Sequence, residues 1–337
     1  MLAAGGCERA EPGERVVLYS SADGYLLREV VADFEDATGI RVDVVGDTEA
    51  TKTTGLVERL LAEREAPRAD VWWSSEPYQT VRLADAGVLA PYTSAPNEAE
   101  LDPWPAGLRD AEGRWYGFAS RARVIAYASD RLDAADVPRR IADLTADAWR
   151  GRVGMARPEF GTTRGHVAAI LAADRPEVLE RWLASMRANG MRIYDGNATV
   201  VAAIARGEID VGLTDTDDVY AAQRNGWRVD FVFEAADDPL TDPLPPTSRG
   251  PLLMPNTVGL VAGGPNPDAA GRLIDYLLSE RASRVIAASD SRNFPVRPEL
   301  RAELGLELPA EAWTIDPAIV ARAMPEAMEV CDRALAP

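Results

Sequence analysis

The chain has 337 residues, 47% of them hydrophobic, and a formal net charge of −18. This composition predicts a globular protein with enough core for two compact lobes, and it excludes a disordered chain. The negative charge argues against a nucleic-acid partner, because such a chain repels phosphate groups. With one histidine, His166, and two cysteines, Cys7 and Cys331, the sequence also excludes His-rich zinc sites and Cys/His catalysis.

The first residues are similar to the end of a bacterial lipoprotein signal peptide. Met1 to Cys7 read M-L-A-A-G-G-C, and a polar stretch follows. We expect residues 1–14 to be a signal-peptide remnant and linker, with the true start upstream and a lipid on Cys7. No run of 18 apolar residues occurs, so this anchor is the only membrane contact we expect. An incidental surface cysteine is the alternative.

The first third of the chain alternates short apolar runs with helical periodicity. Gly39 stands where a helix C-cap glycine belongs. Strands separated by helices of 10 to 15 residues predict βαβ units and a parallel sheet. The predicted strands are 16–19, 41–45 and 70–73, and the predicted helices are 26–38, 56–61 and 77–86.

A second α/β series follows the irregular, proline- and tryptophan-rich stretch 91–115. It predicts an extended segment at 117–128, strands at 193 and 209–213, and helices at 163–173, 179–186 and 199–206. Residues 237–255 contain six prolines and predict a loop or crossover. The chain then resumes with a strand at 258–262 and helices at 269–278 and 281–289. Two series predict two lobes with a ligand cleft between them.

Six segments, in one order from about Val16 to Pro298, resemble the extracellular solute-binding proteins of bacterial ABC importers, specifically the ferric-iron-binding branch. The segments are Leu18–Asp23, Phe34–Val42, Ala69–Glu76, Arg121–Val124, Gly207–Asp210 and Pro255–Val261. The resemblance implies an α/β, two-lobed periplasmic-binding-protein fold of type II, each lobe a mixed, mainly parallel sheet flanked by helices, with a hinge. We expect lobe 1 to comprise 15–118 and 253–300, and lobe 2 to comprise 119–252 and 301–337.

The same resemblance places the metal ligands. Its histidine position falls on Asp23, its glutamate position on Glu76, and its paired tyrosines on Asp217 and Asp218, with the phenol of Tyr220 nearby. Fe(III) is a hard cation that favours anionic oxygen, so these side chains predict a ferric site. Carboxylates equally suit Ca²⁺ or Mn²⁺, and an organic cation would also be balanced by them.

The resemblance further implies a synergistic anion, such as carbonate or phosphate. Arg121 or Arg123 is the expected partner, and we predict that the two side chains point to opposite faces so that only one reaches the cleft. The helix start at Thr162 and Thr163 offers N–H groups to the same anion, and an ordinary helix start is the alternative. Ser20 and Ser21 form a second anion-friendly turn ahead of a helix.

Simpler interpretations of the acids stay open. One of Asp215, Asp217 and Asp218 is accounted for as a helix N-cap, and Glu76 and Asp23 also precede helices. Three carboxylates within four positions exceed what one cap requires, which favours a bound cation. A phosphonate or phosphorylated small molecule is the alternative solute.

A transferase that holds a metal with the pair Asp215 and Asp217 is the alternative of another class. No glycine-rich phosphate loop supports it, so we expect no enzyme. The prediction is therefore a monomeric, lipid-anchored receptor of the bacterial cell envelope. It would deliver ferric iron, or another metal ion, to the permease subunits of an ABC importer.

Overall fold

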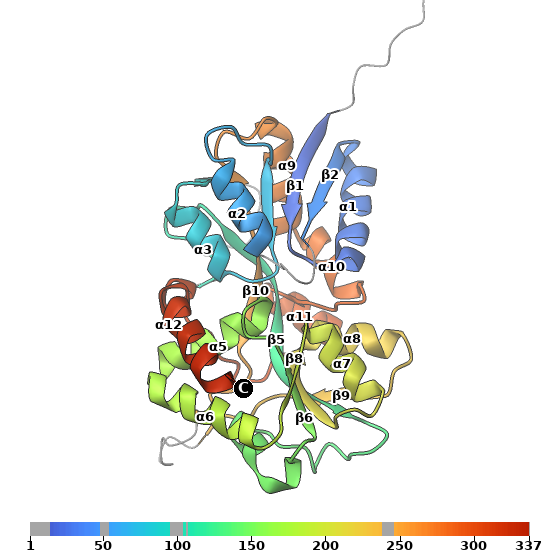
Figure 1. Ribbon diagram of the computed structural model, residues 1–337. Coiled ribbons are helices and arrows are strands. Elements are labelled where there is room, and N and C mark those ends of the chain that lie inside the picture. The colour runs from blue at the N-terminus through green and yellow to red at the C-terminus, as the bar shows by residue number, and fades with distance from the viewer. Residues whose placement is uncertain (1–13, 48–53, 95–103, 106, 238–245, 337) are drawn as a thin grey trace, which may run out of the picture.

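The structure is a computed structural model that describes residues 14–47, 54–94, 104–105, 107–237 and 246–336. Its elements form two α/β lobes, one above the other in Figure 1. Within the described residues the strands join in one path, β2-β1-β3-β10-β5-β8-β6-β7, with β4, β9 and β11 beside it. Residues 1–13, and with them the predicted lipid site at Cys7, lie outside the described part.

The first lobe is built around four strands of this path. β1 pairs in parallel with β2 and β3, and β10 runs antiparallel to β3. The strands are β1 (Arg15–Ser20), β2 (Arg41–Gly46), β3 (Val71–Ser74), β4 (Leu89–Ala90) and β10 (Leu253–Val261). The helices are α1 (Gly24–Thr38), α2 (Thr54–Ala62), α3 (Tyr78–Asp85), α9 (Pro267–Leu278) and α10 (Glu280–Ala288). Gly39 ends α1 with a φ of 73°, as its sequence position predicts.

The second lobe repeats the pattern. β6 pairs in parallel with β7 and β8. The strands are β6 (Val153–Ala156), β7 (Arg192–Tyr194), β8 (Val211–Asp215) and β9 (Val229–Val232). The helices are α5 (Gly161–Ala173), α6 (Pro176–Ala188), α7 (Asn197–Ala205), α8 (Thr216–Arg224) and α12 (Pro317–Leu335), with 3-10 turns at Ile141–Thr145 and Asp147–Trp149.

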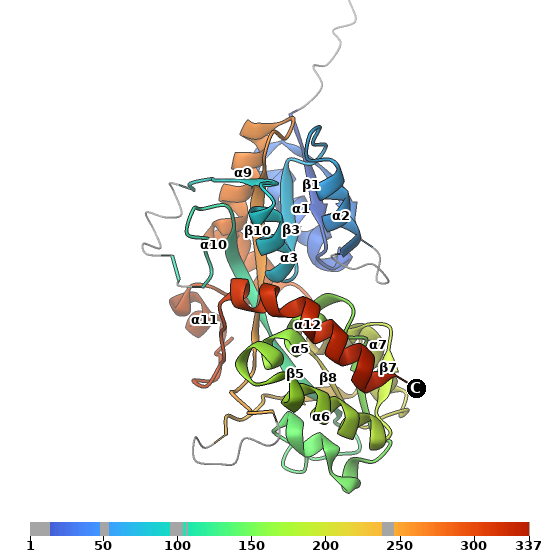
Figure 2. The ribbon, with the colours of Figure 1, turned by 60° about the vertical axis from the view of Figure 1, so that its left-hand side comes forward.

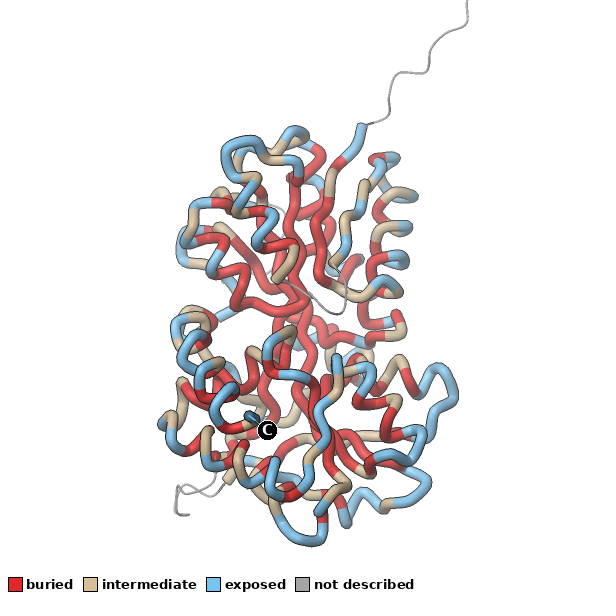
Figure 3. The backbone as a smooth tube through the Cα atoms, viewed as in Figure 1, coloured by how far each residue is buried: buried red, intermediate tan, exposed pale blue. Residues whose placement is uncertain are grey.

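One long strand belongs to both lobes. β5 (Tyr116–Ala128) pairs with β10 through its first half and with β8 and β9 through its second half. It is buried along its whole length, so it forms a continuous core between the lobes (Figure 3). β11 (Phe294–Pro295) pairs with its middle, and α11 (Pro298–Leu304) follows.

The lobes also touch behind the cleft. Tyr78 of α3 belongs to the same buried cluster as Val167 and Leu171 of α5. Gly165 lies so close to its ring that a Cβ there would stand 2.1 Å from a ring carbon. Helix α12 crosses the same region, where Gln79 contacts the sulfur of Met324, and Figure 2 shows it passing below α3.

The predicted architecture is confirmed, and each element predicted with a strong period is present. The short strands β6 and β9 were not predicted, because each has only four residues between turns. The proposed lobe boundaries remain a prediction. Among the described helices, none combines the length and apolar character that spanning a membrane requires.

Candidate ligand-binding site

A cavity of about 180 Å³ lies between the two lobes. Asp23, Tyr25 and Ser75 line it from the first lobe. Arg121, from the shared strand β5, lies at its base, and the second lobe supplies the remaining walls. These include Phe160, Gly161, Thr162, Thr163, Asn197, Val201, Asp215, Asp217, Asp218, Ala221, Ala222, Asn225 and Trp227.

The acids reach the cavity because a strand ends there and a helix starts. β8 ends at Asp215, and Asp217 and Asp218 occupy the first turn of α8, where the helix dipole favours negative charge. Asp215 has the extended conformation of an N-cap, but its side chain makes no capping hydrogen bond. The capping explanation for this residue is therefore wrong, and its carboxylate is engaged elsewhere.

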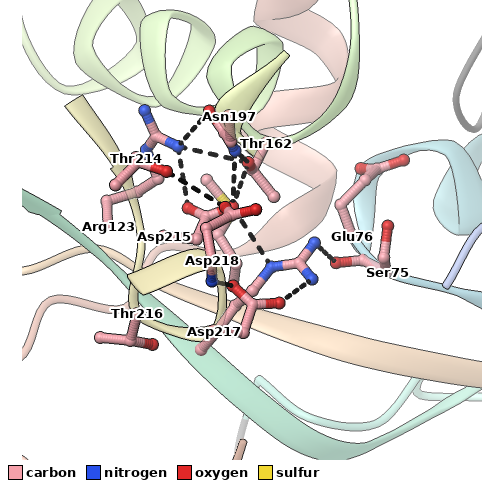
Figure 4. Close-up of polar contacts among 12 residues, drawn as sticks. Ser75, Glu76, Arg123, Thr162, Asn197, Thr214, Asp215, Thr216, Asp217 and Asp218 are labelled. Atoms are coloured by element: carbon pink, nitrogen blue, oxygen red, sulfur yellow. Dashed lines mark hydrogen bonds and ion pairs between the residues drawn. The ribbon is translucent and has the colours of Figure 1, made fainter. Parts of the chain in front are cut away.

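Asp215 is the centre of a buried polar network (Figure 4). Its Oδ1 accepts from Nη1 of Arg123 at 2.8 Å. Its Oδ2 accepts from Nδ2 of Asn197 at 2.9 Å and from the hydroxyl of Thr162. Nε of Arg121 lies 3.4 Å from the same oxygen. Burial alone would raise the pKa of Asp215, but Arg123 and Arg121 outweigh it and hold this pKa below its usual value.

Asp217 and Asp218 face the cavity next to this network. Together with Asp215 they offer one oxygen each within 4.8 Å of one another. Oδ2 of Asp217 accepts from Arg121 at 2.8 Å, and Oδ2 of Asp218 accepts from the Thr214 hydroxyl at 3.1 Å. Burial raises the pKa of Asp217 to about 6, with Asp215 adding to the effect and Arg121 opposing it. This region therefore carries surplus negative charge.

Arg121 and Arg123 lie on the same side of β5, which corrects the prediction that they point to opposite faces, but Arg121 is the one that lines the cavity, while Arg123 contacts Asp215 behind it. Residues two apart in a strand share a face. Arg123 stands directly opposite Asp215 in the β5–β8 ladder, and Nη2 of Arg121 donates to the carbonyl of Ser75 at 2.7 Å. Neither side chain is more than 5% exposed. Arg123 thus pairs with Asp215, and Arg121 pairs with both Asp215 and Asp217.

His166 lies beside Arg123 and outside the acid group. Nε of Arg123 donates to its Nδ1 at 3.4 Å. Burial lowers the pKa of His166 to about 3, and the neighbouring Arg123 adds to this effect. The imidazole is therefore neutral and serves as an acceptor for Arg123.

Glu76 departs from its predicted role as a metal ligand. Its Oε2 accepts from the backbone N–H of Tyr78 at 2.7 Å, and Gln79 N lies 3.3 Å from Oε1. The carboxylate thus caps α3 and does not line the cavity. Burial raises its pKa to about 7, and the two backbone contacts only partly offset this effect.

Tyr220 also departs from the prediction, because α8 turns it away. Its ring packs edge-on against Phe231, and the guanidinium of Arg292 lies 4.7 Å from its centroid. Tyr220, Gln223 and Arg224 instead line a second cavity, between α8 and the end of α10. Helix α8 therefore has a ligand face, with Asp217, Asp218, Ala221, Ala222 and Asn225, and an opposite lobe-contact face.

Tyr25 is the phenol that lines the cavity, although it was not among the predicted site residues. It stands two residues after Asp23 at the start of α1, among the carboxylates of the cavity. Burial raises its pKa well above the usual value, and Asp217 and Asp23 raise it further. Its position next to Asp23 could have indicated Tyr25, because both residues lie at the start of the helix that follows β1.

The remaining predicted contacts divide into two groups. Asp23, Thr162 and Thr163 line the cavity, as expected. Ser20 and Ser21 do not, because their hydroxyl groups support the local backbone: Ser20 Oγ accepts from Ala22 N, and Ser21 Oγ accepts from Ser75 N. Neither serine lines the cavity, and both hydroxyl groups instead hold the backbone beside it.

Asn197 was also missed. It begins α7 directly after β7 and bonds Asp215, Thr162 and, as an acceptor, Arg123. The sequence signal was the polar stretch at the end of a predicted strand, where sheets place ligand contacts.

Comparison with known proteins agrees with this geometry. Residues 29–321 match the family model described as bacterial extracellular solute-binding protein. The chain belongs to this family. The match covers most of the chain and confirms the predicted resemblance.

Individual proteins are similar to this chain over much of their length. Iron uptake protein A1 of Synechocystis is 29% identical over 289 residues, which are 85% of this chain and 77% of that protein. The Fe(3+)-binding periplasmic protein of Serratia marcescens is 30% identical over 63% of this chain and 60% of its own length. The crystal structure of iron-bound HitA from Pseudomonas aeruginosa has a TM-score of 0.80 at 25% identity, covering 95% of this chain and 99% of that one.

The geometry also bears on the pair Asp215 and Asp217. An Asp-x-Asp pair that holds a metal needs both carboxylates available to it. Asp215 is instead saturated by Arg123, Thr162 and Asn197. The relatives, moreover, are named as binding proteins and uptake proteins. The transferase alternative therefore has no support from this site.

Proposed function

We propose that this protein is the solute receptor of a bacterial ABC importer and that its cargo is ferric iron, held in the cleft between the lobes. The observation that carries the proposal is the set of anionic and phenolic oxygens that face one cavity. Asp23 and Tyr25 come from the first lobe, and Asp217 and Asp218 from the second. Hard, highly charged cations prefer such oxygens, and the similar Synechocystis and Serratia proteins are named for iron.

The same arrangement supports capture by closure. A cation that contacts Asp23 on one lobe and Asp218 on the other gains its full set of contacts only when the lobes are together. A ligand shifts a conformational equilibrium by its difference in affinity for the two states, so iron would favour the closed state. The permease subunits would then recognise that closed form.

An accompanying anion fits beside the metal. The first turn of α5, Gly161–Thr163, opens onto the cavity, and helix N-termini favour anions. We propose this turn, with Arg121 nearby, as the place for a carboxylate or phosphate that completes the metal's coordination.

Titration calorimetry tests the cargo. Protein stripped with chelator is titrated with Fe(III)-citrate, with citrate alone and with Mn²⁺, and protein purified without chelator is analysed for metals. We expect tight binding of Fe(III)-citrate and iron in the purified protein. No heat with Fe(III)-citrate, together with iron-free protein, would overturn the proposal.

A second candidate cargo is a small organic molecule that carries a phosphonate or phosphate and an amine. The observation that favours it is that part of the cavity lining is apolar and is formed by Phe160, Val201 and Trp227. A bare ion gains nothing from apolar side chains, whereas an organic chain would pack against them. Micromolar binding of an aminoalkylphosphonate without metal would favour this cargo.

We also propose a lipid anchor at Cys7 and a monomeric, non-enzymatic protein at the cell envelope. The support is the lipoprotein-like sequence before Cys7 and the family membership of the chain. Mass spectrometry of the protein purified from the membrane fraction of a bacterial expression host tests the anchor. A free thiol at Cys7, or an uncleaved peptide before it, would contradict it.

A further inference from the structure

The base of the cavity holds a positive charge of the protein's own. Arg121 arises from β5, the strand shared by both lobes, and its side chain is 5% exposed. Its Nη1 lies 2.8 Å from Oδ2 of Asp217, and its Nε lies 3.4 Å from Oδ2 of Asp215. Its Nη2 donates to the carbonyl of Ser75 in the first lobe. The guanidinium therefore joins the two lobes and occupies the space between two buried acids.

The acids around Arg121 are not equivalent. Asp215 is saturated by Arg123, Thr162 and Asn197, so it remains a structural anchor whatever else binds. Asp217 lines the cavity as Asp215 does, but its contacts differ: Oδ2 accepts from Arg121 and Oδ1 accepts from the backbone N–H of Asp218. A cation that takes Oδ2 of Asp217 as a ligand displaces Arg121 from that oxygen.

We propose that Arg121 is a built-in counter-cation that determines which cations the site accepts. This inference rests on the proposed function and names the residue that sets its selectivity. An ion that displaces the guanidinium from Asp217 must break that ion pair, and the cost of breaking it does not depend on the charge of the ion. The attraction of Asp23, Asp217 and Asp218 for the ion, in contrast, grows with the charge of the ion.

A fixed cost set against a gain that rises with charge discriminates between ions. Divalent cations such as Mn²⁺ and Ca²⁺ gain less from the acids and are excluded by Arg121, whereas Fe(III) gains enough to bind. A carboxylate cluster that would otherwise suit Ca²⁺ thereby becomes selective for a trivalent ion. Without Arg121, the cavity would be an ordinary acidic site open to divalent ions.

The test replaces Arg121 and measures a panel of cations by calorimetry. Arg121→Gln removes the charge and leaves a shorter, neutral polar side chain. We expect Mn²⁺ and Ca²⁺ to bind this variant at least about tenfold more tightly than they bind the wild type. The matched control is Arg206→Gln, which removes an exposed arginine paired with Glu208 and should leave the Mn²⁺ and Ca²⁺ affinities unchanged.

A second variant covers the case in which Arg121→Gln does not fold. Arg121→Lys keeps the charge but cannot contact Asp217 and Ser75 with a rigid fork, so it should bind Mn²⁺ more tightly than wild type by a few-fold and less tightly than Arg121→Gln. Divalent affinities in the folded variants that equal those of the wild type, or that rise by no larger a factor than the Fe(III)-citrate affinity, would overturn the inference. If Fe(III)-citrate binds neither the wild type nor any variant, the iron proposal fails. The comparison of Mn²⁺ and Ca²⁺ affinities still decides the role of Arg121 in that case.

Discussion

The ring of Tyr78 in the first lobe lies directly against the backbone of Gly165 in the second. A Cβ on Gly165 would stand 2.1 Å from Cε2 of that ring, which is too close for any side chain. The two residues thus fix how tightly α3 can approach α5 behind the cleft.

Gly165→Ala should therefore push the lobes apart at this contact. We expect a loss of about 1 to 3 kcal/mol in the free energy of unfolding, typical of overpacking, measured by urea denaturation. Small-angle scattering should show a larger radius of gyration. Gly24→Ala is the control, since its added Cβ meets only the end of the Arg28 side chain at 3.6 Å. A Gly165→Ala protein as compact and stable as wild type would contradict this account of the contact.

Asp218→Asn tests the ligand face of α8. The amide keeps an oxygen that can accept from the Thr214 hydroxyl but removes the charge. We expect Fe(III)-citrate affinity to fall by about 100-fold, near 3 kcal/mol, in calorimetry. Tyr220→Phe is the matched control on the opposite face, and it should bind as wild type does, because that ring contacts Phe231 and Arg292. Equal losses in both variants would mean that the two faces are wrongly assigned.

Tyr25→Phe should change the colour of the iron-loaded protein. A phenolate bound to Fe(III) gives a charge-transfer band in the visible, and Tyr25 is the phenol that lines the cavity. We expect the wild type to show this band on addition of Fe(III)-citrate and Tyr25→Phe to lack it while retaining weaker binding. Tyr220→Phe should keep the band, and a band that survives in Tyr25→Phe would exclude this residue as a ligand.

The lobe-contact face of α8 carries an ion pair that we expect to contribute to ligand binding by holding the lobes together. Nε of Arg224 lies 2.6 Å from Oδ1 of Asp290, beyond the end of α10. Arg224→Glu should weaken Fe(III)-citrate binding by about two- to five-fold, because an exposed pair is worth about 0.2 to 1 kcal/mol. The double variant Arg224→Glu, Asp290→Arg should recover it at low salt. If the double variant is as weak as the single one, the pair does not join the lobes.

Glu234 should make stability depend on pH. It is 8% exposed and accepts from the Ser248 hydroxyl, and burial raises its pKa to about 7. The folded protein therefore holds this proton where the unfolded chain, with a carboxyl pKa near 4.5, has lost it. The contribution of Glu234 to stability is then full below about pH 4.5 and is lost as the pH rises to about 7.

Glu234→Gln removes that dependence. We expect it to stabilise the fold by about 2 to 3 kcal/mol at pH 8 and to have little effect at pH 4, in urea denaturation at both values. Glu326→Gln, which changes an exposed acid on α12, should show no such difference between the two pH values. A Glu234→Gln protein that is less stable than wild type at pH 8 would contradict the direction of the shift.

The sequence predicted the fold well because its elements carry strong periods and caps. Leu26, Val30 and Phe34 mark the buried stripe of α1, and Gly39 ends it. Short strands such as β6 carry too few residues for a period, and they form only because β7 and β8 lie beside them. Their existence is a tertiary effect that a local pattern cannot contain.

The site was predicted in part, for two geometric reasons. The acids at 23, 217 and 218 were found because they follow strands, where ligands bind. Tyr220 was misplaced because a helix turns about 100° per residue, which sets its side chain about 200° from that of Asp218. Arg121 and Arg123 were assigned to opposite faces, although the period of a strand puts them on the same one. Glu76 was taken for a ligand because a cap and a ligand have the same sequence signature.

The two faces of α8 have a consequence for how such receptors diversify. Asp217 and Asp218 line the cavity between the lobes, whereas Tyr220 and Arg224 line the second cavity, next to the end of α10. Under the proposed function, substitutions on the first face would therefore change which ligands the cavity accepts without altering the contact between the lobes. One helix of nine residues thus separates the side chains that would determine ligand choice from those that contact the other lobe.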